Sequence, residues 1–124
     1  KICIISAKDK VKYHAAAAIA SNLVVGLIDL SEKLLMECGF ERDEAGDALA
    51  PIVWGNIKHI LNNGVVEALT GPIERGDADT IKKHLATISG NDRETYIAVS
   101  RQVLEVAKRK NKDRDYSKIE EILK

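Results

Sequence analysis

Five polar side chains recur along one face of a largely apolar segment near the start of the chain, and these residue types are suited to chemistry. Residues 9–38 contain no proline and read as one helix that ends at Gly39. At 100° per residue, a stripe about 120° wide holds Lys10, His14, Ser21, Asn22 and Asp29. Burying a polar group unpaired costs roughly 1–3 kcal/mol. The stripe therefore predicts contact with water or a ligand, or else pairing with polar groups of neighbouring helices.

A second candidate is the break at residues 70–77, which Gly and Pro punctuate. The guanidinium of Arg75 is suited to bind a carboxylate or phosphate through two hydrogen bonds. Thr70 and the backbone amides near Gly71 offer further donors to polar ligand atoms. The alternative is an ordinary loop between helices in which Asp77 is the N-cap of the next helix.

Other catalytic and metal-binding patterns are missing from the sequence. The three histidines, His14, His59 and His84, lie too far apart to form a local metal motif, and neither HExxH nor CxxC occurs. There is no GxSxG, no Ser-His-Asp signature and no GxGxxG. The basic run at 108–114 is interrupted by an acid and predicts a solvated helix end. No metal site is expected.

Composition narrows the class of protein. The chain has 124 residues, 45% of them hydrophobic, and 19 Lys and Arg balance 19 Asp and Glu. Zero net charge disfavours a nucleic-acid partner, and no uninterrupted apolar run reaches the roughly 20 residues of a membrane span. Two cysteines are too few for a disulfide framework and fit a reducing cytoplasm. We therefore expect a soluble cytoplasmic domain that binds neither nucleic acid nor membrane.

The first and only methionine is Met36, while the chain begins at Lys1. A removed signal peptide or a larger parent protein would each explain this pattern, and together with the cysteine usage it favours a fragment of a larger cytoplasmic protein. Residues 1–6 form a short apolar run that suits a buried strand, although one strand cannot make a sheet alone.

The hydrophobic spacing predicts an all-α bundle of about five helices around one long central N-terminal helix. That helix is apolar nearly all round, which predicts cover on most sides, in part by a partner subunit. Four later helices are expected, at 42–61, 78–89, 93–110 and 116–123. The first of them should kink at Pro51 and stop at 62–64, and the second should stop at Gly90. The third should follow an N-cap at Asn91 or Asp92. Residues 65–69 predict one more turn.

Two strings in the chain resemble a known family. They are K-x-x-Y-H-A-A-A-x-x-A-S-N, from Lys10 to Asn22, and A-L-T-G-P-I-x-R-G-D, from Ala68 to Asp77. Both resemble the C-terminal helical domain, domain of unknown function 2520, of Rossmann-type oxidoreductases related to pyrroline-5-carboxylate reductase. The resemblance covers about Lys10 to Val106.

The resemblance implies a homodimer whose helical domain is like the C-terminal domain of 6-phosphogluconate dehydrogenase. Residues 1–9 would connect it to a missing N-terminal Rossmann domain that binds NAD(P), and 10–124 would dimerise and close the substrate cleft. The reaction implied is hydride transfer to or from a small, anionic substrate. Without the Rossmann domain, the chain would be inactive.

The same resemblance implies roles for individual side chains. His14 would donate or accept a proton, since its unperturbed pKa lies near neutrality. Ser21 and Asn22 would orient the substrate or nicotinamide, and Lys10 would supply positive charge. Thr70, Gly71 and Arg75 would hold the anionic group of the substrate. The alternative is a stand-alone helical module for protein interaction or small-ligand binding, in which the polar stripe lines a pocket or an interface.

Overall fold

Every regular element in the computed structural model, which describes residues 1–124, is helical, and this confirms the all-α class. Five α-helices have ten or more residues, as expected. The elements are η1 (Ala7–Asp9), α1 (Lys10–Ala20), α2 (Asn22–Glu37), α3 (Arg42–Ala68), α4 (Pro72–Arg75), α5 (Ala78–Thr87), α6 (Gly90–Lys110) and α7 (Ser117–Ile122). The chain divides into two compact units, Lys1–Ala50 and Pro51–Lys124.

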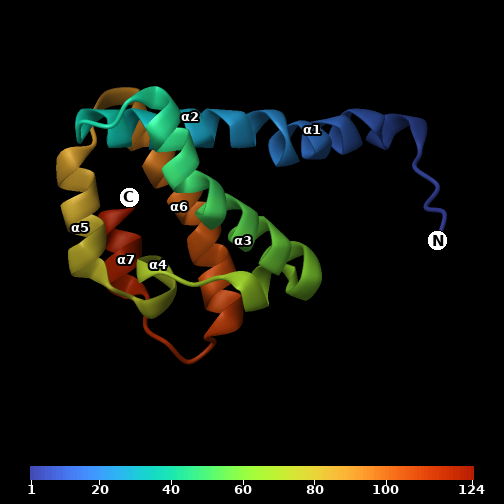
Figure 1. Ribbon diagram of the computed structural model, residues 1–124. Coiled ribbons are helices and arrows are strands. Elements are labelled where there is room, and N and C mark those ends of the chain that lie inside the picture. The colour runs from blue at the N-terminus through green and yellow to red at the C-terminus, as the bar shows by residue number, and fades with distance from the viewer. The chain divides into compact units, whose positions relative to one another are not determined.

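In the first unit, the helix expected over 9–38 is interrupted at Ser21. The backbone of Ser21 has φ −123° and ψ −73°, and its hydroxyl donates a 2.6 Å hydrogen bond to the carbonyl of Ala17. Such back-bonding by serine locally competes with the helical ladder. The prediction of one continuous helix is therefore wrong at this residue, although α1 and α2 run on in nearly the same direction (Figure 1).

Helix α2 ends just before Gly39, as the sequence predicts. Gly39 has φ +100°, a conformation open to glycine. Its N–H donates to the carbonyl of Met36 at 3.0 Å, and the N–H of Phe40 donates to that of Leu35 at 3.2 Å. These two bonds form a Schellman motif that satisfies the last carbonyls of the helix.

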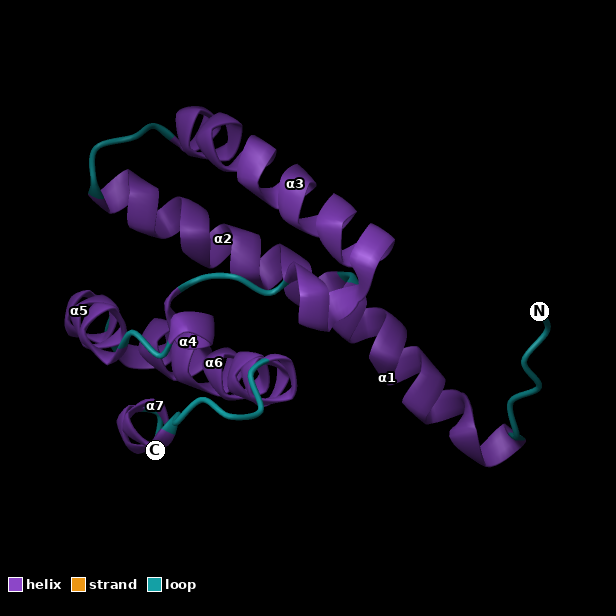
Figure 2. Cartoon of the chain, turned by 90° about the horizontal axis from the view of Figure 1, so that it is seen from below, coloured by secondary structure: helices purple, strands orange, loops and turns teal.

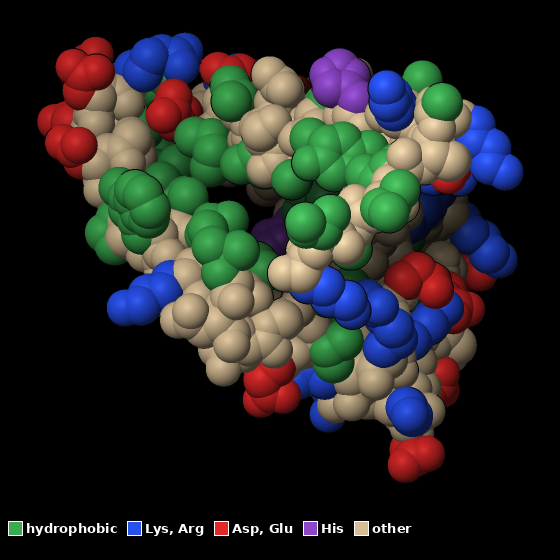
Figure 3. All heavy atoms as spheres, turned by 90° about the vertical axis from the view of Figure 1, so that its right-hand side faces the viewer, with side chains coloured by type: hydrophobic (Ala, Val, Ile, Leu, Met, Phe, Trp, Pro, Cys, Tyr) green, Lys and Arg blue, Asp and Glu red, His purple; other side chains and the backbone are tan.

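No side chain of α1 or α2 is buried. Val11 is 80% exposed and Leu23 is 57% exposed, and Figure 3 shows hydrophobic side chains gathered over one part of the face that it draws. The single chain thus leaves most of α1 exposed and covers α2 only in part. Residues 1–6 form no strand, and Ile2 and Ile4 are exposed, so the expectation of a buried strand is wrong.

The segment Ala7–Glu37 contains an 18-residue window with a mean hydropathy of 1.4, so by length and composition alone it is long and apolar enough to cross a membrane. A count of uninterrupted apolar residues misses it, because Ser21, Asn22 and Asp29 break the run without lowering its mean hydropathy far. Core helices of other proteins and signal sequences pass the same test.

Pro51 lies inside α3 without taking the backbone out of helical geometry. The non-helical residue of α3 is Gly64, with φ +85° and ψ +166°, so the predicted stop at this glycine and the extra turn after it are confirmed. The predicted end at residue 61 becomes a break within an element that continues to Ala68.

The second unit has its own hydrophobic core, to which α4, α5, α6 and α7 contribute (Figure 2). Ile81 is fully buried and Tyr116 is 4% exposed. The buried members of this core are Ile73, Ile81, Leu85, Leu104, Ala107, Tyr116, Ile119 and Leu123. The helix predicted at the C-terminus is present as α7 and supplies part of this core.

The boundary between α5 and α6 differs from the prediction. Helix α5 ends at Thr87, and Gly90, expected as its stop, is instead the first residue of α6. Ser89 is the N-cap of α6, with its carbonyl accepting from the N–H of Arg93. Asn91 and Asp92 therefore lie in the first turn and are not the cap.

Candidate functional site

Lys10 and His14 lie on α1 and leave their functional groups accessible. They are four residues apart, so they share one face of the helix, and both are exposed. Neither side chain has a hydrogen bond or an ion pair within the chain, which leaves an amine and an imidazole available to a ligand. For these two side chains, the alternative of pairing with polar groups of neighbouring helices is not realised within the chain.

Ser21 and Asn22 lie where α1 passes into α2. The single hydroxyl proton of Ser21 is used in its bond to the carbonyl of Ala17, so this hydroxyl can offer only lone pairs to a ligand. The Oδ1 atom of Asn22 lies 3.3 Å from Ser21 Oγ, while its amide group is exposed and free to donate.

Asp29 has a structural partner. Its carboxylate lies 3.5 Å from the guanidinium of Arg42 at the start of α3, and the carboxylate of Glu32 lies 3.1 Å from the same guanidinium. The stripe is thus divided in two. One part is paired between helices, and the other, which contains Lys10, His14 and Asn22, is open.

The second candidate, residues 70–77, is one tight helical turn between two glycines. Gly71 has φ +103° and precedes Pro72 at the start of α4, while Gly76 has φ +71° and ends it. The N–H of Gly76 donates to Ile73 at 3.0 Å, and the N–H of Asp77 donates to Pro72 at 2.8 Å. The turn is therefore closed by the same motif that ends α2.

This turn presents its polar groups outward. The side chain of Arg75 is 59% exposed, and its guanidinium meets only the carboxylate of Asp77, at 3.9 Å. Thr70 is exposed and has no side-chain partner. The arrangement leaves a hydroxyl and most of a guanidinium free to bind an anion.

Asp77 is the N-cap of α5, as predicted. One carboxylate oxygen accepts from the N–H of Thr80 at 3.1 Å, and the other accepts from the Thr80 hydroxyl at 2.7 Å. These hydrogen bonds, helped by the charges of Arg75 and Lys83, lower the pKa of Asp77 from its ordinary value of 3.8. The carboxylate is thus ionised and committed to the cap.

The basic run at 108–114 is not only a solvated helix end. Lys110 donates to two backbone carbonyls at the end of α3, and Arg114 donates to the carbonyl of Glu74 in α4. Lys108 binds Glu120 of α7 at 2.6 Å, and this hydrogen bond raises the pKa of the lysine. The sequence reasoning missed these contacts, since the partners are mostly backbone carbonyls, which carry no sequence signal.

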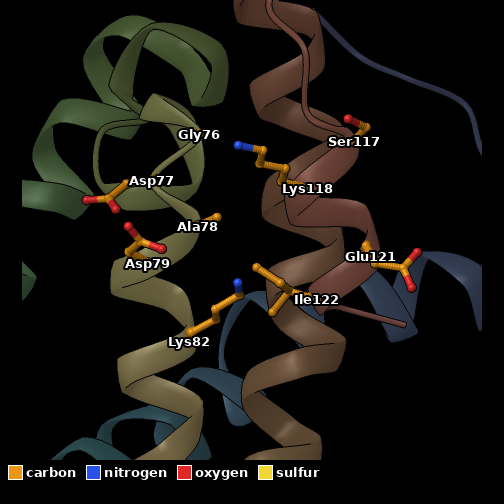
Figure 4. A pocket seen from close by; sticks show the side chains of 9 residues that line it. All are labelled: Gly76, Asp77, Ala78, Asp79, Lys82, Ser117, Lys118, Glu121 and Ile122. Atoms are coloured by element: carbon orange, nitrogen blue, oxygen red, sulfur yellow. The ribbon is translucent and has the colours of Figure 1, made fainter.

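A groove lies between the start of α5 and α7, close to the turn (Figure 4). Asp77, Asp79 and Lys82 line it on the α5 side, and Lys118 and Glu121 line it on α7, so each wall carries both charges. The mixed charge favours neither an anion nor a cation. None of the residues predicted for binding lines this groove.

The open stripe and the exposed turn belong to different units. Lys10, His14, Ser21 and Asn22 lie in Lys1–Ala50, whereas Thr70, Gly71 and Arg75 lie in Pro51–Lys124.

Comparison with known families gives one match. The family described as "Domain of unknown function (DUF2520)" matches residues 1–103. This chain belongs to the DUF2520 family. Both groups of candidate residues, from Lys10 to Arg75, lie inside the matched range. Searches of curated proteins and of solved structures returned no match to this chain.

Proposed function

We propose that this DUF2520 chain is the dimerisation and substrate-cleft domain of an NAD(P)-dependent oxidoreductase. The observation that carries the proposal is that α1 and α2, although apolar, bury none of their side chains within one chain. An apolar helix gains stability from being covered, and a second copy of the chain would supply that cover.

Helix α3 supports self-association in the same way. Trp54, Ile57 and Leu61 recur at helical spacing, and Trp54 is 75% exposed. Large exposed aromatic and aliphatic side chains are typical of the centre of subunit interfaces. The homodimer remains part of the proposal.

The polar side chains that have no partner within the chain support the proposed substrate cleft. In this proposal His14 gives or takes a proton, Lys10 supplies positive charge, and Ser21 and Asn22 orient the reacting groups. Thr70, the backbone at Gly71 and the guanidinium of Arg75 hold an anionic group of the substrate. These side chains are accessible, which such roles require.

NAD(P), when bound, supplies or receives the hydride. Residues 1–124 contain no strand and therefore no glycine-rich turn between a strand and a helix. The cofactor would be held mainly by a Rossmann domain on the N-terminal side of this chain, and this chain alone would not catalyse the reaction.

The coding sequence upstream of the Lys1 codon tests the proposal first. A βαβ pattern that opens with a glycine-rich turn would support it. An upstream sequence without that pattern would contradict the oxidoreductase role and leave the stand-alone interaction or ligand-binding module.

Replacing His14 tests the catalytic role in the longer protein. We expect His14→Ala to lower NAD(P)H turnover by about 10²–10⁴-fold, the usual contribution of general acid–base catalysis. His59→Ala is the matched control, because His59 is an exposed histidine on α3 outside the proposed cleft. Equal turnover of the two variants would remove His14 from the mechanism.

Sedimentation of the protein at tens of micromolar, with and without lipid vesicles, tests whether a second copy of the chain or a bilayer covers the apolar surface of α1 and α2. A dimer in the absence of lipid is expected. A monomer would contradict the proposed dimer, and a chain that sediments with vesicles would assign the Ala7–Glu37 segment to a bilayer.

A further inference from the structure

One backbone carbonyl in α4 receives an unusual number of side-chain donors. The carbonyl of Glu74 accepts from the hydroxyl of Tyr116 at 2.6 Å and from the guanidinium of Arg114 at 2.6 Å. Two short bonds match the two lone pairs of a carbonyl oxygen. Both donors come from the segment that connects α6 to α7, about 40 residues along the chain.

The side chain of Glu74 is held by the same segment. Its Oε1 atom accepts from the amide of Asn111 at 2.9 Å and lies 3.5 Å from the guanidinium of Arg114. The Asn111 amide also lies 3.0 Å from the hydroxyl of Tyr116. Three side chains thus form one network around a single residue of the turn.

The chain just before the turn is held as well. The ammonium of Lys110 donates to the carbonyl of Leu69 at 2.7 Å and to that of Glu67 at 3.2 Å. These carbonyls lie at the end of α3, where helical partners run out. The two ends of the segment 67–74 are therefore both tied to residues 110–116.

The turn needs such support. A helix of four residues is unstable alone, because its few hydrogen bonds do not offset the cost of nucleation. Within α4, Ile73 is the buried side chain, and the neighbouring glycines gain freedom when the turn opens. External hydrogen bonds to its carbonyls would hold it closed.

We propose that Lys110, Asn111, Arg114 and Tyr116 form a brace that fixes the turn 70–77 and thereby the position of the Arg75 guanidinium. They are positioning residues, since they touch the turn through Glu74 and the end of α3. All four lie after residue 103, outside the range matched by the family. The consequence for ligand binding rests on the proposed anion-binding role of Arg75, whereas the brace itself does not.

Amide hydrogen exchange measured by NMR tests the brace. The reporters are the N–H groups of Arg75, Gly76 and Asp77, which donate within the turn. We expect Tyr116→Phe, which removes one hydroxyl and keeps the ring in the core, to speed their exchange about fivefold. The amide of Leu104 in the core should exchange within about twofold of the parent.

Arg114→Ala provides an independent variant, because this side chain is 41% exposed and its loss leaves the core intact. We expect exchange in the turn to rise at least about fivefold, as loss of a charged hydrogen bond predicts. Lys112→Ala is the matched control, since Lys112 is exposed in the same segment and binds nothing in the turn.

Two results would overturn the brace. One is unchanged exchange in the turn for both Tyr116→Phe and Arg114→Ala. The other is equal acceleration at Leu104, which would mean that the turn opens only with the whole unit.

Titration with inorganic phosphate separates the brace from the proposed function. If phosphate shifts the Arg75 amide resonance of the parent, Tyr116→Phe should raise the half-saturating concentration severalfold. Faster exchange without any phosphate response in the parent would support the brace and contradict the anion-binding role. The reverse pattern, a phosphate response without a change in exchange, would contradict the brace.

Discussion

The two compact units use similar apolar residues in opposite ways. Residues 51–124 bury Ile81, Leu104 and Ile119 in a core of their own, whereas α1 and α2 leave Val11 and Leu23 exposed. Because burial provides roughly 25 cal/mol per Å² of apolar surface, these side chains stabilise the second unit directly. In the first unit, Ala45 is fully buried, but no side chain of α1 or α2 is, so the apolar surface of these two helices contributes less within the single chain.

Polar contacts show the same contrast. In the second unit, side chains such as Lys110, Arg101 and Tyr116 donate to backbone carbonyls far away in sequence and fix the segments between helices. In the first unit, Arg42 pairs with Asp29 and Glu32 in a contact that is largely exposed. Exposed ion pairs contribute little to stability. The proposed dimer therefore rests on the first unit, whose apolar helices are the less covered part of the chain.

The largest expected effect is on the core of the second unit. Ile81→Ala should lower the free energy of unfolding by about 2–5 kcal/mol, because it leaves a cavity at a fully buried position. Leu23→Ala in the first unit should cost less than about 0.5 kcal/mol in the monomer. Urea denaturation measures both, and Ile81→Val, expected to cost about 0.5–1.5 kcal/mol, covers the case in which the alanine variant does not fold. If Ile81→Ala and Leu23→Ala lowered the free energy of unfolding equally, the two units would not differ in how burial stabilises them.

A charge on the uncovered helix should act on association. Leu23→Asp is expected to raise the dimer dissociation constant at least tenfold, about 1.4 kcal/mol, because a carboxylate would be desolvated in an apolar interface. Sedimentation velocity over a concentration series measures this constant. Gln102→Asp, at an exposed position of α6, is the control and should leave it unchanged. If both variants associate like the parent, Leu23 lies outside the interface.

Much of the fold could be predicted from the sequence, because local chemistry decides it. Gly39 and Gly64 end helices where only glycine adopts the backbone conformation easily, and Asp77 caps α5 through a side chain three residues from its partner. The interruption at Ser21 was missed, since serine inside an apolar helical pattern carries no signal for bonding back to Ala17. The run at residues 1–6 shows that strand-like composition does not make a strand without a neighbouring strand.

For the candidate site, the sequence could predict which residue types take part but not which of them would have partners in the fold. Periodicity placed Lys10 and His14 on one face of a helix, and the structure leaves both open. It could not separate them from Asp29, whose partner Arg42 lies 13 residues away on another helix. The brace around Glu74 was missed for the same reason, since contacts across 40 residues leave no pattern in the sequence.

The smallest expected effect concerns Asp77, which ties the exposed turn to the start of α5. The pKa of Asp77 is lower in the folded chain than its ordinary value of 3.8, mainly because of its hydrogen bonds with Thr80. The stabilisation is therefore fully present above the unfolded pKa and is lost as the pH falls through the folded pKa. Asp77→Ala should lower the thermal midpoint by a few degrees at pH 7, with a difference from the parent that shrinks below about pH 4.

Asp77→Asn separates the cap from its charge, because asparagine is an equally good N-cap residue that does not titrate. We expect its midpoint at pH 7 to lie close to that of the parent. Asp115, whose pKa is lowered by its hydrogen bonds to Ser117, titrates in the same range in every variant. The informative quantity is therefore the difference between variant and parent at each pH, measured by circular dichroism. A difference for Asp77→Ala that stays constant down to pH 2 would show that the ionised carboxylate does not stabilise α5, and that the second unit does not depend on this cap.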